Sequence, residues 1–124
     1  MRIIFGIVAG LLVMGLVVGI MEVAGHVLFG GPSQRAPLLI LVLVAYFLGA
    51  LLGGAVAARI ARVKWPAWVI AAAVLAGAIW SMTVINHPGW MIVAAIVAPL
   101  LGGLAAARLA PAPAPRTGGA DARA

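Results

Sequence analysis

Four long runs of apolar residues dominate the chain, and the short breaks between them hold many of its polar residues. The runs cover approximately residues 3–25, 37–59, 65–85 and 88–108. Each is close to the ~20 residues that a helix needs to cross the ~30 Å hydrocarbon core of a bilayer. None alternates between apolar and polar positions, as the strands of a membrane barrel do. The pattern therefore predicts an all-α fold, an integral membrane bundle of four helices.

The composition agrees with a membrane location. Of the 124 residues, 66% are hydrophobic and only 8% are charged, whereas about 25% of the residues in a soluble domain are charged. So few charges could not cover a surface that faces water. We expect one four-span domain over residues 1–110. Residues 111–124 are rich in Pro, Ala and Gly, which cannot pack a core, and are expected to form a disordered cytoplasmic tail.

The Lys and Arg residues predict the orientation of the chain. They form no run and lie near the ends of the apolar segments, which argues against nucleic acid and favours membrane lipid as the partner. If the break between the second and third runs is cytoplasmic, Arg35 is the one basic residue outside. The inside set then holds seven residues: Arg2, Arg59, Arg62, Lys64, Arg108, Arg116 and Arg123. This bias predicts a multi-pass protein of the bacterial inner membrane with both termini in the cytoplasm (N-in, C-in).

A repeated sequence lies in the second and fourth runs. Leu51–Ala61 reads LLGGAVAARIA and Leu100–Ala110 reads LLGGLAAARLA, with eight of eleven positions identical. The glycine pairs follow no strand and precede no Lys-Ser/Thr, so they do not resemble phosphate loops. In lipid, small residues let helix backbones approach closely. We therefore expect helix packing at Gly49, Gly53, Gly54, Gly102 and Gly103. Duplication of a hairpin and convergence on one packing solution explain the repeat equally well.

Few side chains of the apolar runs and their connections could carry chemistry. Glu22 and His26 are four residues apart, on one face of the first helix. The predicted topology places Arg35, His87 and the outer half of the third span, with Trp80, on the same side. These five residues are the candidates for ligand or proton binding. The alternative interpretations are structural. They are pairing of Glu22 with His26 or Arg35 at the membrane interface, capping of the fourth helix by His87, and packing of Trp80 against neighbouring helices or lipid.

The sequence predicts no enzyme and no cofactor. Its few Ser and Thr residues form no pattern of nucleophile and base. The absence of Cys excludes disulfides and thiol chemistry. Glu22, His26 and His87 are residue types that bind zinc, but two histidines far apart in the sequence do not form a metal-binding motif, and no metal is predicted.

Two resemblances bear on function. Glu22-Val-Ala-Gly-His26 with His87-Pro-Gly-Trp90 resembles the pattern of small four-span bacterial inner-membrane proteins to which no activity is assigned. Met21–Gly25 and Ala78–Ser81 (Ala-Ile-Trp-Ser) are similar to motifs of the small multidrug resistance transporters. The second resemblance implies that Glu22 binds protons and a cationic substrate in alternation and that Trp80 stacks on the substrate. In those transporters the Glu lies in mid-span, whereas Glu22 is near the end of its run.

The sequence thus predicts a small membrane protein with a structural or accessory role. It would act through helix contacts with a second copy or with a larger membrane complex. The alternative is a proton-coupled cation transporter of the small multidrug resistance type that uses Glu22.

Overall fold

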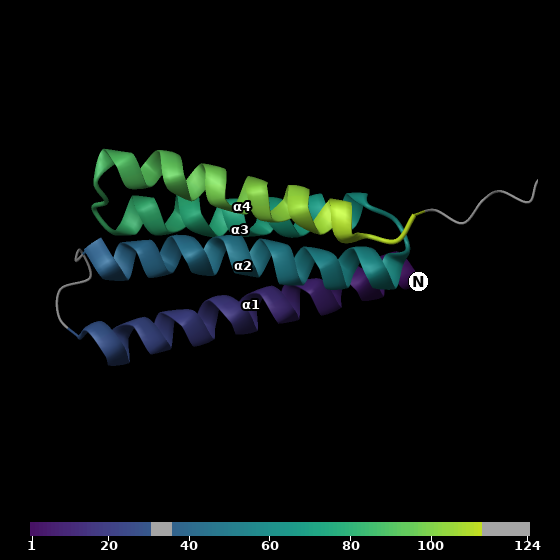
Figure 1. Ribbon diagram of the computed structural model, residues 1–124, viewed down its shortest axis with the longest axis horizontal. Coiled ribbons are helices and arrows are strands. Elements are labelled where there is room, and N and C mark those ends of the chain that lie inside the picture. The colour runs from purple at the N-terminus through teal and green to yellow at the C-terminus, as the bar shows by residue number, and fades with distance from the viewer. Residues whose placement is uncertain (31–35, 113–124) are drawn as a thin grey trace, which may run out of the picture.

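Four α-helices in series form the described part of the computed structural model, which comprises residues 1–30 and 36–112. They are α1 (Arg2–Phe29), α2 (Ala36–Ala61), α3 (Trp65–Val84) and α4 (Gly89–Leu109). They lie side by side and alternate in direction (Figure 1). Each is long and apolar enough to span a membrane. The all-α four-helix bundle predicted from the hydropathy pattern is confirmed.

The helices end where local chemistry stops them. α1 continues past Glu22 and His26 to Phe29, four residues beyond its predicted end, because the apolar residues continue that far. It closes with a hydrogen bond from the backbone N–H of Gly30 to the carbonyl of His26 (3.2 Å). α2 ends at Ala61, and the next residue, Arg62, takes a positive φ of 59°. Of the predicted tail, residues 113–124 lie outside the described residues.

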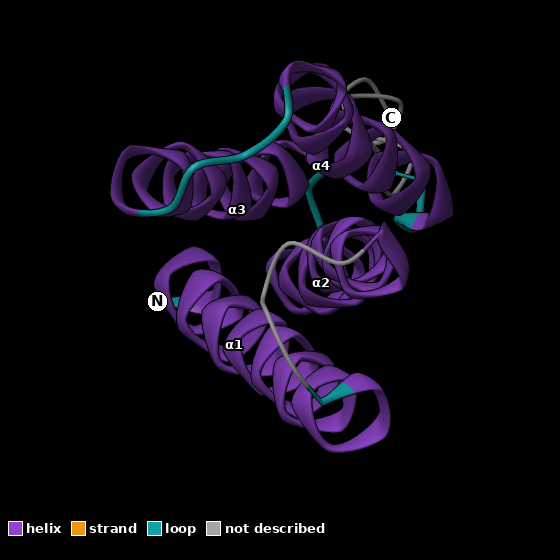
Figure 2. Cartoon of the chain, turned by 90° about the vertical axis from the view of Figure 1, so that its left-hand side faces the viewer, coloured by secondary structure: helices purple, strands orange, loops and turns teal. Residues whose placement is uncertain are grey.

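The central helix of the bundle is α2, which contacts α1, α3 and α4. Over the described ranges α1 touches α2 and α3 but not α4. Figure 2 shows this arrangement from one end. α1 lies close to α2 near its N-terminus and diverges from it along its length (Figure 1).

The alternation of helix direction gives the bundle two chemically different ends. The end that holds the N-terminus, where α2 and α4 finish, we call the basic end. It carries Arg2, Arg59, Arg62, Lys64 and Arg108. We call the opposite end, where α1 and α3 finish, the polar end. It carries Glu22, His26 and His87.

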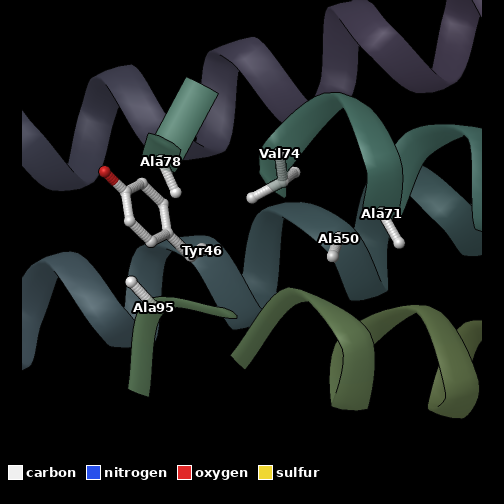
Figure 3. Packing of buried hydrophobic residues seen from close by; sticks show 6 residues of the cluster. All are labelled: Tyr46, Ala50, Ala71, Val74, Ala78 and Ala95. Carbon is white, nitrogen blue, oxygen red and sulfur yellow. The ribbon is translucent and has the colours of Figure 1, made fainter. Parts of the chain in front are cut away.

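Small side chains, mostly Ala, fill most of the interior, and most of the large ones cover the outside. The main core cluster consists of Tyr46, Ala50, Ala71, Val74, Ala78 and Ala95 (Figure 3). Large exposed side chains such as Leu12, Leu16 and Val93 face outward instead, and apart from Tyr46 with its hydroxyl, no residue with a polar or charged side chain in the described ranges is buried. Such a surface would aggregate in water but suits lipid.

The glycines expected to pack helices all lie at close helix contacts. If a Cβ were added at each, it would lie between 2.5 and 2.9 Å from an atom of another helix. The nearest atoms are the Val18 side chain for Gly49, the Gly10 carbonyl for Gly53, the Ala106 Cβ for Gly54, the Phe47 carbonyl for Gly102 and the Ala71 Cβ for Gly103. Only glycine fits at these points without a shift of the neighbouring helix or side chain.

Candidate functional site

The polar end holds a cavity of about 190 Å³ to which all four helices or their ends contribute. We call it the end cavity. Its polar lining consists of Glu22, His26, Tyr46, Ser81 and His87. The rest of the lining is apolar apart from backbone: Met21, Gly25, Leu38, Leu39, Leu41, Val42, Ile85 and Met91. The divergence of α1 from α2 explains the position of the cavity, since at Gly25 α1 meets the tip of the Leu41 side chain rather than the backbone of α2.

Glu22 and His26, which are both exposed, line the cavity from α1, one helical turn apart. The Nδ1 atom of His26 lies 2.8 Å from the backbone carbonyl oxygen of Glu22. Because a carbonyl oxygen only accepts hydrogen bonds, Nδ1 carries the proton and donates it. The predicted proximity of the two residues is therefore present, but the bond involves the backbone of Glu22 and leaves its carboxylate for other partners.

Tyr46 and Ser81 form the inner part of the lining. Tyr46 of α2 is only 7% exposed, and its ring lies between Ala78 of α3 and Ala95 of α4 (Figure 3). Its hydroxyl is hydrogen-bonded to the side chain of Ser81. The bond to Ser81 links α2 and α3 near the polar end of the bundle.

His87 enters from the connection between α3 and α4. Its Nδ1 atom donates a hydrogen bond to the backbone carbonyl of Ile85 at 2.6 Å. The ring is partly buried and lines the cavity. Glu22 and His87, which are 65 positions apart in the sequence, thus share one small site.

Not every candidate from the sequence belongs to the site. Trp80 is 72% exposed and does not line the end cavity, because it faces away from the bundle while its neighbour Ser81 faces inward. Arg35 lies outside the described residues. Among the residues that the structure describes, no three His, Asp or Glu side chains are placed to hold a metal ion.

Sequence reasoning overlooked Tyr46. A usable signal was present, because Tyr46 is the only tyrosine of the chain and stands in the middle of an otherwise apolar run. A hydroxyl at that position needs a hydrogen-bonding partner inside the bundle.

Comparisons with profiles of known protein families, with curated protein sequences and with solved structures gave no match.

Proposed function

We propose that this chain is a small integral membrane protein with an accessory role, acting through contacts of its helices with a second copy or with a larger membrane complex. The observation that carries this proposal is an open ridge of small residues on α1. A Cβ added at Gly15 or at Gly19 would meet no atom within 4 Å. Both residues line a shallow apolar groove that is formed by α1 alone.

α1 also carries a second pair of glycines, which another helix covers. Gly6 and Gly10 have the same spacing as Gly15 and Gly19, and α2 packs closely against both. Between membrane helices, close packing of small residues supplies the attraction that the hydrophobic effect supplies in water. A second ridge of this kind, exposed to lipid, is suited to another helix.

We also propose the bacterial inner membrane as the location, with both termini in the cytoplasm. The distribution of charge supports this orientation, because the basic end carries all the Lys and Arg residues of the described helices and connections. The polar end, with the end cavity, then faces the outside.

The alternative function is proton-coupled transport of a cation at Glu22. The position of Glu22 in the lining of the end cavity favours a binding role for it. The outward orientation of Trp80 is unfavourable, because a ring outside the cavity cannot stack on a substrate inside it. We therefore keep the accessory role as the main proposal.

Disulfide cross-linking in native membranes tests that proposal cleanly, because the chain has no cysteine of its own. Ile20→Cys places a thiol in the groove of α1, and Val93→Cys places one on the exposed surface of α4; the two native side chains are 58% and 64% exposed. We expect Ile20→Cys, and not Val93→Cys, to give a cross-linked dimer or a specific heterologous product.

A second substitution shows whether the small residues matter. Gly19→Leu in the Ile20→Cys background should abolish the product by filling the ridge. Gly77→Leu is the matched control, because Gly77 of α3 also has no atom within 4 Å of an added Cβ. Equal cross-linking by Ile20→Cys and Val93→Cys, or an unchanged product with Gly19→Leu, would contradict contact through α1.

A further inference from the structure

We propose that the end cavity binds a small primary amine in its protonated, ammonium form. This inference goes beyond the accessory role and does not depend on it, since it requires neither self-association nor transport. It rests on the hydrogen-bonding character, the charge and the size of the cavity.

Hydrogen bonding makes the cavity rich in acceptors. His26 and His87 both use Nδ1 to donate to a backbone carbonyl. In a neutral imidazole the other nitrogen, Nε2, then has a lone pair and can only accept. The Glu22 carboxylate adds two further acceptor oxygens. A ligand that satisfies these groups must supply several N–H or O–H donors.

The charge of the lining selects among such ligands. Glu22 is the one residue of the lining that carries a formal charge at neutral pH when histidine is neutral. The described Lys and Arg residues lie at the basic end and contribute nothing to the lining. An alkylammonium group, with three N–H donors and one positive charge, complements this set, and charge-assisted hydrogen bonds are stronger than neutral ones.

The remaining walls define the other end of the ligand. They consist mainly of Leu, Val, Ile and Met side chains, which suit a short apolar substituent. The cavity volume of about 190 Å³ is below the ~300–1,000 Å³ of sites for drug-sized molecules. The inner hydroxyl pair of Tyr46 and Ser81 is already joined by its own hydrogen bond. The site is thus shaped for an amine with a chain of few carbons.

The single tyrosine makes a direct test practicable. The full-length protein, labelled with 3-fluorotyrosine and held in nanodiscs, reports only on the end cavity in a ¹⁹F NMR spectrum. We would titrate it with n-butylammonium chloride, with 1-pentanol as an uncharged ligand of similar size, and with butyltrimethylammonium chloride, which has the charge but no N–H donor. We expect a saturable shift of the Tyr46 signal with butylammonium alone.

Substitutions of the acceptor residues test whether these residues bind the amine. Glu22→Gln keeps the shape and removes the charge, and should weaken butylammonium binding about ten- to a hundredfold. His87→Phe removes a second acceptor and should weaken it as well. Thr83→Val is the matched control at the polar end, because Thr83 does not line the cavity and its hydroxyl bonds to the Trp80 carbonyl; its binding should equal that of the parent.

Each other result would overturn the proposal. If 1-pentanol bound as tightly as butylammonium, the cavity would not recognise charge. If butyltrimethylammonium bound as tightly, the cavity would not recognise N–H donors. The proposal also fails if butylammonium causes no saturable shift. Undiminished binding by both Glu22→Gln and His87→Phe, each giving the single ¹⁹F line of the folded protein, would place the ligand elsewhere.

Discussion

Gly10 of α1 and Gly53 of α2 lie in reciprocal backbone contact. A Cβ added to Gly10 would lie 2.6 Å from the carbonyl oxygen of Gly53, and one added to Gly53 would lie 2.6 Å from the carbonyl oxygen of Gly10. Neither position can carry a side chain unless the two helices separate. The contact holds α1 against α2 near the basic end, before α1 diverges toward the end cavity (Figure 1).

Replacement of Gly53 by Ala should therefore destabilise the bundle. The added methyl group would also lie 2.8 Å from the Met14 Cβ, so backbone and side chain would both have to move. Overpacking of this kind lowers the free energy of unfolding by about 1–3 kcal/mol. Unfolding in mixed micelles with increasing SDS, followed by circular dichroism, measures the change.

Gly77→Ala is the control for Gly53→Ala, because the added methyl group at Gly77 meets no atom within 4 Å. Alanine also favours a helix over glycine by up to about 1 kcal/mol. We expect the Gly77 variant to be as stable as the parent or slightly more stable. Equal destabilisation by the two substitutions would mean that the Gly10–Gly53 contact does not limit stability.

The repeat shows what a sequence can and cannot predict about such contacts. The spacing of small residues predicted Gly53, Gly54, Gly102 and Gly103 as packing positions, and all four contact another helix. Their partners did not follow from the repeat. Gly53 meets α1, its own hairpin partner, whereas its counterpart Gly102 meets α2 of the other hairpin.

The second glycine of each pair shows the opposite exchange. Gly54 lies against Ala106 of α4 and Ala67 of α3, in the other hairpin, whereas its counterpart Gly103 lies against Ala71 of α3, its own hairpin partner. Equivalent positions of the two copies therefore have non-equivalent surroundings. This exchange favours convergence on a common packing surface over a preserved pseudo-symmetric duplication.

The candidate site was predictable to the extent that helix direction determines it. Alternating spans necessarily bring Glu22, His26 and His87 to one end of the bundle. The rotation of each helix about its axis was not predictable, because these helices are apolar on every side and have no polar face to orient them. For this reason Trp80 was expected at the site and faces outward, while Tyr46 was overlooked and lines the cavity.

The hydrogen bond between Tyr46 and Ser81 should contribute measurably to stability. Tyr46→Phe keeps the ring and removes the hydroxyl, and Ser81→Ala removes the partner. Each change should lower the free energy of unfolding by about 0.5–1.5 kcal/mol. The double variant should lose less than the sum of the two, because the bond can be lost only once. Additive losses in the same SDS titration would contradict a direct bond.

The turn after α2 contains a residue whose backbone conformation favours glycine. Arg62 has a φ of 59°, in the left-handed region that glycine adopts without strain and other residues do not. The free energy of unfolding of the Arg62→Gly variant should therefore be about 1–2 kcal/mol higher than that of the Arg62→Ala variant. The comparison between the two variants cancels the loss of the arginine charge. If Arg62→Ala were the more stable variant, the left-handed geometry of this turn would be contradicted.

Fusions of alkaline phosphatase, which is active only outside the cytoplasm, test the proposed orientation. The connection between α2 and α3 contains Arg62 and Lys64, and Arg59 lies one turn before it. Three positive charges so close together are strongly retained on the cytoplasmic side. A fusion after Lys64 should therefore be inactive, and one after His87, at the opposite end of α3, should be active.

Replacement of Arg59, Arg62 and Lys64 by Gln should raise the activity of the fusion after Lys64, because it removes the positive charges that retain this connection in the cytoplasm. The reverse pattern in the parent chain, active after Lys64 and inactive after His87, would place the end cavity on the cytoplasmic side.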